Sequence, residues 1–341
     1  MRFGLLYDFR NPPAWRESDT GLYAQTLEQM VYAEQLGYDS VWISEHHFLE
    51  DGYLPSLFVA AGAISQRTSR VRIGTSVLLL PMHHPLRVAE DGAVADVLSE
   101  GRLDVGIGLG YREEEFQAFG VPRRQRPSRM EEGLDILLKA WTEECFSHQG
   151  RYYQFENVSV RPRPVQQPHP SIWMAASSAA AAQRAARYRL PLTMRGGPSV
   201  YQAYAEALRA QGEDPAAYEV LTRRSVYVTD DPEAAWAQIK PYILYQTEAY
   251  ASWENPGLNA ATDQSRSLPE RARQTWIIGN ATQVIAAIEE LQRTLGLTEL
   301  ISFGVPPGMP PPLMLPAIER FALEVMPHFR PFGGGRGEGF M

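Results

Sequence analysis

Short apolar runs alternate with amphipathic segments along most of the chain, at intervals of a few tens of residues. Runs that are almost wholly apolar predict strands buried on both faces, and apolar residues at helical spacing predict the helices between them. The eight predicted strands cover residues 3–7, 41–44, 71–79, 103–107, 172–175, 192–194, 220–228 and 300–303. The predicted helices cover residues 22–36, 55–65, 85–98, 128–141, 178–188, 199–211, 231–245, 281–295 and 313–325.

Eight strand–helix units within 341 residues favour one closed parallel barrel over an open doubly wound sheet. We therefore expect an α/β protein with a single (β/α)8 TIM-barrel domain over residues 1–341. Two segments interrupt the alternation. Residues 142–170 contain several prolines and predict an excursion with a hairpin. Residues 246–275 are polar, without a long apolar period, and predict a long insertion that closes over the site as a lid.

Hydrophobic residues make up 44% of the chain and charged residues 21%, as in an ordinary soluble enzyme. The formal charge of −8 argues against a nucleic-acid binder, because the densest basic run, residues 123–126, is short. A single cysteine, Cys145, excludes an internal disulfide and suits a reducing cytoplasm. No run approaches ~18 apolar residues, and the first residues lack the apolar region of a signal peptide. We expect a cytoplasmic protein that does not bind membranes.

The stretch Glu45-His46-His47-Phe48 carries the clearest chemical signal, because it follows the apolar run Ser40–Ile43 directly. Ionisable groups at the end of a buried strand need partners and often mark functional sites. Neighbouring residues on extended backbone point to opposite faces, so at most one of His46 and His47 lines a given pocket. A pair of hydrogen-bonded structural histidines is the alternative interpretation.

The glycines of Gly106-Ile107-Gly108-Leu109-Gly110 do not form a dinucleotide-binding motif, since Tyr111 stands where that motif needs glycine. Their strand is also the fourth rather than the first. Glycines at a strand end leave room for a flat ligand against the backbone. Tight barrel packing alone would explain them too.

Hydroxyl and basic residues follow the next two predicted strands. Ser177 and Ser178 open a predicted helix, where free N–H groups and hydroxyls can bind an anion. Arg195 ends the sixth strand, from which it can reach a phosphate or carboxylate. Plain helix caps and a surface arginine are the alternatives.

Two other kinds of site are not expected. A metal site needs three or four converging ligands, whereas His46, His47, His83 and His84 come in adjacent pairs that should diverge. The chain also lacks the Gly-x-Ser-x-Gly motif of a serine hydrolase.

Several motifs together resemble the bacterial luciferase-like superfamily of flavin-dependent oxidoreductases, along nearly the whole chain and most strongly over residues 40–120. Glu45-His46-His47-Phe48 looks like that family's Glu-His-His-Phe motif. Other similar stretches are Gly74-Thr75-Ser76-Val77, Leu80-Pro81, His84-Pro85-Leu86-Arg87, Glu90-Asp91, Gly101-Arg102-Leu103 and residues 106–120, 278–284 and 325–329. The motifs are specific for the superfamily and much less so for a substrate.

The resemblance implies a barrel that binds reduced flavin at the C-terminal ends of its strands. His46 matches the histidine that serves luciferases in catalysis, and Glu115 occupies a position that is acidic there, near the flavin. Ser177 matches a hydroxyl that binds the flavin phosphate, and Arg129 matches an arginine available to that phosphate. The candidate catalytic residues are therefore His46, Glu45 and Glu115. The candidate cofactor-binding residues are Ser76, Gly108, Gly110, Arg129, Ser177, Ser178 and Arg195.

Luciferase-like proteins often hold a non-prolyl cis peptide beneath the flavin ring, and the matching bond here is Ser76–Val77. Two positions depart from luciferase α chains. Leu109 replaces a phosphate-binding arginine and Ala180 replaces a threonine, although Ser178 and Arg195 could compensate. The weaker phosphate site leaves room for the deazaflavin F420, which a sister branch of the superfamily uses.

The first hypothesis is a monooxygenase that uses reduced FMN and O2 on a small organic substrate and receives its flavin from a separate reductase. His46 would act as acid or base, and we expect a homodimer. One alternative is F420-dependent hydride transfer without oxygen. Another is a non-catalytic flavin-binding subunit, like luciferase β chains, although the intact Glu-His-His-Phe motif speaks against it. The sequence does not identify the substrate.

Overall fold

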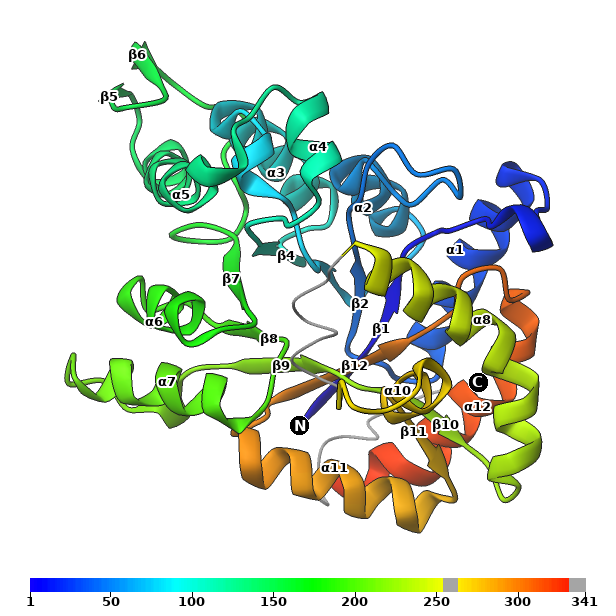
Figure 1. The fold of residues 1–341 in the computed structure, drawn as a ribbon. Coiled ribbons are helices and arrows are strands. Elements are labelled where there is room, and N and C mark those ends of the chain that lie inside the picture. The colour runs from blue at the N-terminus through cyan, green and yellow to red at the C-terminus, as the bar shows by residue number, and fades with distance from the viewer. Residues whose placement is uncertain (254–262, 331–341) are drawn as a thin grey trace, which may run out of the picture.

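The computed structural model describes residues 1–253 and 263–330, and within them the predicted barrel is confirmed. Eight parallel strands close in the order β1-β12-β9-β8-β7-β4-β3-β2 around a common axis (Figure 1). Their bounds are β1 Arg2–Tyr7, β2 Ser40–Ile43, β3 Arg72–Thr75, β4 Leu103–Ile107, β7 Ser171–Ala176, β8 Leu192–Met194, β9 Val220–Arg223 and β12 Glu299–Phe303. Because all eight are parallel, their C-terminal ends meet at one end of the barrel, where barrel enzymes place their active sites.

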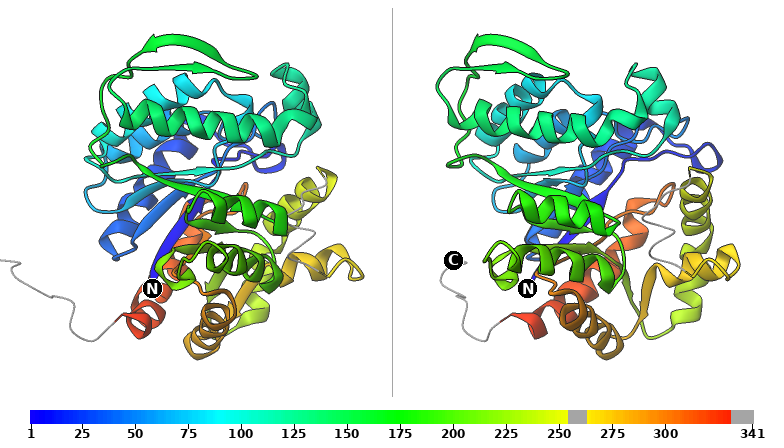
Figure 2. Two further views of the ribbon diagram at one scale, coloured as in Figure 1. Left: turned by 90° about the vertical axis from the view of Figure 1, so that its left-hand side faces the viewer. Right: turned by 60° about the vertical axis from the view of Figure 1, so that its left-hand side comes forward.

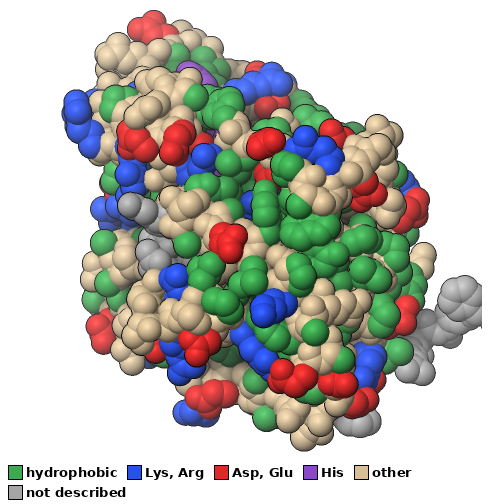
Figure 3. Space-filling view, turned by 45° about the vertical axis from the view of Figure 1, so that its right-hand side comes forward, with side chains coloured by type: hydrophobic (Ala, Val, Ile, Leu, Met, Phe, Trp, Pro, Cys, Tyr) green, Lys and Arg blue, Asp and Glu red, His purple; other side chains and the backbone are tan. Residues whose placement is uncertain are grey.

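The helices surround the barrel, as two further views show (Figure 2). The long ones are α1 Asp19–Gln35, α2 Leu57–Ser65, α3 Pro85–Leu98, α5 Arg126–Thr142, α6 Ala179–Arg187, α7 Pro198–Arg209, α8 Pro232–Ser252 and α11 Ala281–Leu295. Shorter helices are α4 Glu113–Ala118, α10 Leu268–Gln274 and α12 Leu315–Arg320. No helix among the described residues is long and apolar enough to cross a membrane. Charged side chains of both signs are interspersed over the face drawn in Figure 3.

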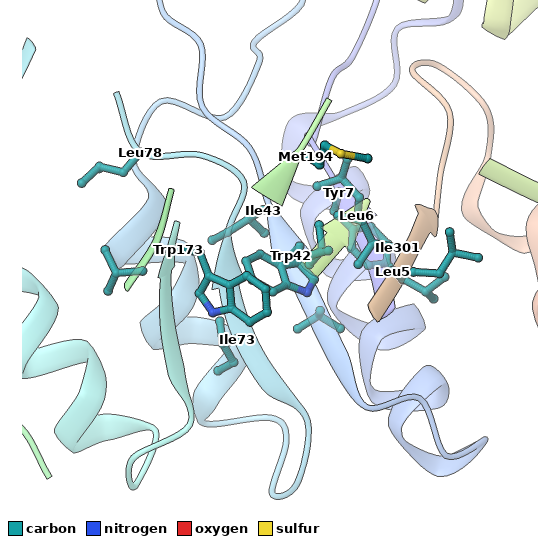
Figure 4. Close-up of a cluster of buried hydrophobic side chains, with 14 of the residues drawn as sticks. Leu5, Leu6, Tyr7, Trp42, Ile43, Ile73, Leu78, Trp173, Met194 and Ile301 are labelled. Carbon is teal, nitrogen blue, oxygen red and sulfur yellow. The ribbon is translucent and has the colours of Figure 1, made fainter. Parts of the chain in front are cut away.

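Two tryptophans fill the interior of the barrel (Figure 4). The rings of Trp42 and Trp173 are fully buried and meet edge to face, with centroids 5.6 Å apart. Gly74 makes room for the first indole, because a Cβ there would lie 2.1 Å from Trp42. Trp42 Nε1 donates to Glu299 Oε1 at 2.8 Å, so its polar atom is satisfied. The barrel is thus a packed core, and any ligand must bind above it, beyond the strand ends.

Two predicted strands are shorter than expected. The run 71–79 leaves the sheet after Thr75, where the Ser76–Val77 peptide bond is cis, as the resemblance implies. The run 220–228 divides into β9 and β10, Ser225–Val228. Strand β10 leaves the barrel and pairs in parallel with β11, Trp276–Gly279. Its apolar residues do pack in a strand, but against a partner about fifty residues away that the local pattern does not reveal.

The two predicted interruptions differ in outcome. The excursion at 142–170 contains the expected hairpin, formed by β5, Phe146–Gln149, and β6, Gln154–Val158, which projects from one edge of the barrel (Figure 1). The prediction that 246–275 lacks regular structure is wrong at both ends. Helix α8 continues to Ser252, and α10 covers Leu268–Gln274. The centre of the predicted lid, residues 254–262, lies outside the described residues.

Candidate active site

A cavity of about 300 Å³ lies at the C-terminal ends of the barrel strands. This volume is at the lower end of the range typical of small-molecule sites. Residues from the loops after five strands, from the ends of β7, β8 and β9 and from three helices contribute to its wall. The lining residues are Ser44, Glu45, His46, Tyr53, Ser76, Val77, Leu79, Gly108, Leu109, Gly110, Tyr111, Arg126, Ala175, Ala176, Ser177, Ser178, Ala181, Thr193, Arg195, Arg223 and Tyr250.

His46 is held between a carboxylate and a phenol. Its Nδ1 lies 2.8 Å from Glu115 Oε1, and its Nε2 lies 3.0 Å from the hydroxyl of Tyr111. Glu115 is fully buried and also accepts hydrogen bonds from the His47 N–H at 2.9 Å and from Arg112 Nη1 at 3.2 Å. A carboxylate that binds Nδ1 fixes the imidazole ring and its tautomer, with Nδ1 protonated and Nε2 as the acceptor for the Tyr111 hydroxyl.

Burial sets the charge state of this pair. It lowers the pKa of His46, and the hydrogen bond to Glu115 only partly offsets the effect, so the imidazole is neutral at pH 7. Burial opposes ionisation of Glu115 as well, but the hydrogen bonds from His46 and His47 and the charge of Arg112 outweigh it and lower the pKa of Glu115. An ionised carboxylate beside a neutral imidazole is an arrangement that can accept a proton at His46 Nε2.

His47 faces the other way, as the alternation of neighbouring residues predicts, and the carboxylate of Glu45 turns to it although Glu45 also borders the cavity. Glu45 Oε1 accepts from the Nε2 atoms of His47 and His83, each at 2.6 Å, and its Oε2 accepts from the Leu79 N–H at 3.0 Å. His46 and His47 diverge as expected, but His47 and His83, one from each pair, converge on Glu45, so the expectation that potential ligands do not converge is wrong. With three donors engaged, Glu45 joins the loop after β2 to the loop after β3.

The backbone beside the cavity approaches closely where the glycines stand. A Cβ at Gly108 would lie 2.3 Å from the side chain of Val77, and one at Gly110 would lie 2.9 Å from Met82. Gly110 also has a φ of 73°, which favours glycine. Ser76 lines the same part of the wall, next to the cis bond. The close approach is to the protein's own side chains, as the alternative of tight packing predicts, while Gly108, Gly110 and Ser76 also line the cavity.

Ser177 and Ser178 lie where expected, at the start of α6 and on the cavity wall. Ser178 is the N-cap, with its hydroxyl accepting from the Ala181 N–H at 3.4 Å. Arg129 is not brought to the cavity. It contacts Gln125 and Tyr153 and stacks over Tyr152 instead. Arg126, one turn earlier on α5, lines the cavity in its place.

Arg195 lines the cavity, but its guanidinium points toward aromatic residues around His46. It lies 6.0 Å from the ring of Tyr250, and its charge acts on Tyr111 and Tyr53. Tyr53 and Tyr111 each meet His46 edge to face, with ring centroids 4.8 and 5.4 Å away. Arg195 thus interacts with the tyrosines around His46.

Several polar lining residues are not identified as site residues from the sequence: Ser44, Tyr53, Arg126, Thr193 and Arg223. Arg223 has a usable signal, because an arginine pair interrupts the otherwise apolar predicted strand 220–228. Tyr250 comes from the part of the chain in which no regular structure is predicted. It reaches the site because α8 extends that far.

Comparison with known proteins identifies the family. The sequence profile of the luciferase-like monooxygenases matches residues 1–298. The oxygenase component of a flavin-dependent trigonelline monooxygenase from Acinetobacter baylyi is 27% identical over 96% of both chains. An alkanal monooxygenase alpha chain from Photorhabdus luminescens is 29% identical over 57% of this chain and 53% of its own length. An uncharacterized protein of Sinorhizobium fredii is 36% identical, and the chain spans only 49% of it.

Solved structures agree with this assignment. A monooxygenase from Streptomyces bottropensis superimposes with a TM-score of 0.82 at 27% identity, covering 97% of this chain and all of the other. An FMN complex of the oxygenating constituent of 3,6-diketocamphane monooxygenase from Pseudomonas putida has a TM-score of 0.81 over 96% and 98% of the two chains. Its 20% identity supports the fold alone. The chain therefore belongs to the luciferase-like monooxygenase family.

Proposed function

We propose that this protein is the oxygenase of a two-component flavin-dependent monooxygenase, which uses reduced FMN and O2 on a small organic substrate. The observation that carries the proposal is the pair of His46 and Glu115 at the mouth of a cavity on a luciferase-like barrel. A relative that aligns over nearly its whole length is called an oxygenase component, which supports a separate reductase as partner. A homodimer and a cytoplasmic location are the remaining parts of the proposal.

The described residues fit FMN. The flat ring would lie against the cavity wall formed by Ser76, Val77 and Gly108, where glycine allows the backbone to pack closely against Val77. The phosphate would lie near Ser177 and Ser178 at the start of α6, where hydroxyls and free backbone N–H groups favour an anion. Arg126 supports this position, since its buried Nη1 has no hydrogen-bond partner among the described residues. Reduced FMN, when bound, supplies the electrons for activating O2 and transferring oxygen to the substrate.

The chain's own residues would then move one proton and exclude water. His46 Nε2 is available to take a proton from the substrate, while Glu115 holds the ring and stabilises the imidazolium that forms. Tyr111 can pass a proton through its hydroxyl, 3.0 Å from His46 Nε2. Glu45 is a positioning residue in this proposal, because both its oxygens are engaged by other groups.

The two alternatives are less well supported. An F420-dependent secondary alcohol dehydrogenase shares the fold with a TM-score of 0.77, but at 19% identity this supports the fold alone. Leu109 on the cavity wall is the residue that favours it, as a replacement for a phosphate-binding arginine. A non-catalytic subunit is disfavoured by the intact geometry of His46 and Glu115.

The proposal is tested by mixing the purified chain with a flavin reductase, NADH and FMN and measuring oxygen uptake and hydrogen peroxide. Binding of reduced FMN should lower the peroxide released per NADH oxidised when a substrate is turned over. The control is the same reductase without the chain. Peroxide yields that equal this control for every candidate substrate, with no reduced FMN bound, would refute the proposal.

A further inference from the structure

Two arginines stand side by side at the open end of the barrel. Strands β8 and β9 are parallel, with Met194 opposite Thr222, so the next positions in register are Arg195 and Arg223. Neighbouring strands are about 4.8 Å apart, which brings these two side chains to the same part of the cavity wall. Their guanidinium carbons lie 6.0 and 5.8 Å from the centre of the Tyr250 ring.

No carboxylate forms an ion pair with either arginine within residues 1–253 and 263–330. Other buried arginines of the site have such a partner: Arg10 binds Asp51 at 2.6 Å, and Arg112 binds Glu115 at 3.2 Å. The charge of Arg223 lowers the pKa of Asp8, but the charge of Arg10 lowers it more. The adjacent positive charges of Arg195 and Arg223 therefore repel each other without a fixed counter-charge.

The electrostatics agree with this contrast. Burial opposes the charge of Arg10, yet Asp8 and Asp51 outweigh it and raise the pKa of that guanidinium. Burial also opposes the charge of Arg195, and the repulsion from Arg223 opposes it further, so the pKa of Arg195 is lowered. An anion between the two arginines would reverse this effect, as the aspartates do for Arg10.

The side chain of Gln246 lies beside the same two arginines. A recess of about 60 Å³ adjoins the cavity, and Arg195, Arg223 and Gln246 are among its lining residues. Gln246 is 6% exposed, and its Nε2 has no hydrogen-bond partner among the described residues. Gln246 Nε2 is a buried donor without a partner, which is costly, and the two arginines beside it have no ion pair among the described residues. Together they indicate a ligand with acceptor oxygens.

We propose that Arg195, Arg223 and Gln246 bind a carboxylate of the substrate, so that the enzyme acts on an organic acid. The inference rests on the proposed function and adds the substrate class. The recess has the size of one small oxyanion, and it shares Arg195, Arg223 and Tyr250 with the wall of the larger cavity, into which the rest of the substrate would extend toward His46. Planar guanidinium groups suit a carboxylate because they can donate two parallel hydrogen bonds.

The anion could instead be the phosphate of the cofactor, and the test separates the two. FMN-loaded protein, whose phosphate site is filled, is titrated calorimetrically with benzoate and hexanoate and with their neutral amides. At least one carboxylate should bind tenfold or more tightly than its amide. Arg195→Gln and Arg223→Gln should each weaken that carboxylate by about 10–100-fold, the range expected for a lost charged hydrogen bond. Arg189→Gln, at an exposed arginine paired with Glu213, should change nothing.

Gln246→Leu should weaken the carboxylate less, by roughly 3–10-fold, because it removes a neutral donor. The proposal is overturned if no carboxylate binds more tightly than its amide, or if the arginine variants bind it as the wild type does. It is also overturned if the variants lose affinity for FMN but not for riboflavin, since the pair would then hold the cofactor phosphate. That result would leave the proposed flavin-dependent function intact. A wild-type chain that binds no flavin would refute both the proposed function and the carboxylate site.

Discussion

Replacing Glu45 by glutamine should weaken the fold and displace the catalytic histidine, because this carboxylate joins the two loops that frame the cavity. Its oxygens accept from His47, His83 and the Leu79 N–H. A glutamine has only one acceptor oxygen, and its NH2 group would face a donor wherever it points. The substitution therefore removes a charge and leaves at least one buried donor unpaired.

The pKa of Glu45 gives the magnitude of the effect. Burial opposes ionisation of Glu45, but the charge and hydrogen bonds of His83 and His47 outweigh it and lower the pKa from about 4.5 to about 2. Lowering a pKa by one corresponds to about 1.4 kcal/mol, so the ionised carboxylate contributes about 3 kcal/mol to the free energy of unfolding. This contribution is present above about pH 4.5 and is lost as the pH falls toward 2.

His83 sets the upper limit of this range. Burial lowers its pKa, but Glu45 outweighs burial and raises the pKa above its usual 6.5. The stabilisation from a charged His83 is full below 6.5 and declines as the pH rises through the higher folded-state pKa. The Glu45 variant should therefore lose most stability, about 3 kcal/mol, near pH 5–6 and less at pH 9.

Urea unfolding at pH 5.5 and pH 9 measures this difference, with Glu156→Gln as control because Glu156 is exposed and has no ion pair among the described residues. Turnover by the folded variant should also fall, since the loop that carries His46 loses its attachment to Leu79. A loss of stability below about 1 kcal/mol at pH 5.5, or an equal loss at both pH values, would refute the reasoning.

The remaining predictions concern the cavity. His46→Ala should fold and bind flavin but lose about 10²–10⁴-fold in turnover, unlike the exposed control His328→Ala; wild-type turnover would return His46 to a structural role. Ser177→Ala and Arg126→Ala should weaken the binding of FMN more than that of riboflavin in fluorescence titrations. Equal losses would show that the phosphate binds elsewhere. Gly108→Ala should weaken both flavins alike, because its methyl group would overlap Val77 and displace that lining side chain; unchanged affinities would contradict the proposed wall.

The barrel could be predicted because each strand carries its own local signal. Runs such as Leu103–Ile107 are largely apolar, and Gly37 and Pro85 mark the ends of neighbouring helices. The division of 220–228 could not be predicted in the same way. Its second half, Ser225–Val228, pairs with Trp276–Gly279, and such long-range pairing leaves no trace in the local pattern.

Some residues of the candidate site could likewise be predicted from the sequence and others could not. His46, Ser177 and Gly108 could be located because each follows a predicted strand directly, and all parallel strands end on one side of the barrel. The resemblance points to Arg129 rather than Arg126, but Arg126 stands at the start of α5, where the helix borders the cavity, and Arg129 lies almost one turn farther along it. Tyr250 depends on the length of α8, which its polar composition conceals.

Glu45 shows a further limit of the sequence. Its place in the Glu-His-His-Phe motif suggests catalysis, but its chemistry depends on His83 and Leu79, which lie 38 and 34 positions away in the sequence. The sequence shows ionisable groups near one another on the chain but not the donors that a fold brings to them from elsewhere.

Anaerobic binding of reduced FMN tests the central claim most directly. Purified chain is titrated with chemically reduced FMN and, separately, with reduced F420, and the bound fraction is measured by ultrafiltration or by the change in flavin fluorescence. We predict saturable binding of reduced FMN at one site per chain, with much weaker binding of F420. Failure to bind reduced FMN, or tighter binding of F420, would contradict the assignment of this chain as an FMN-dependent oxygenase.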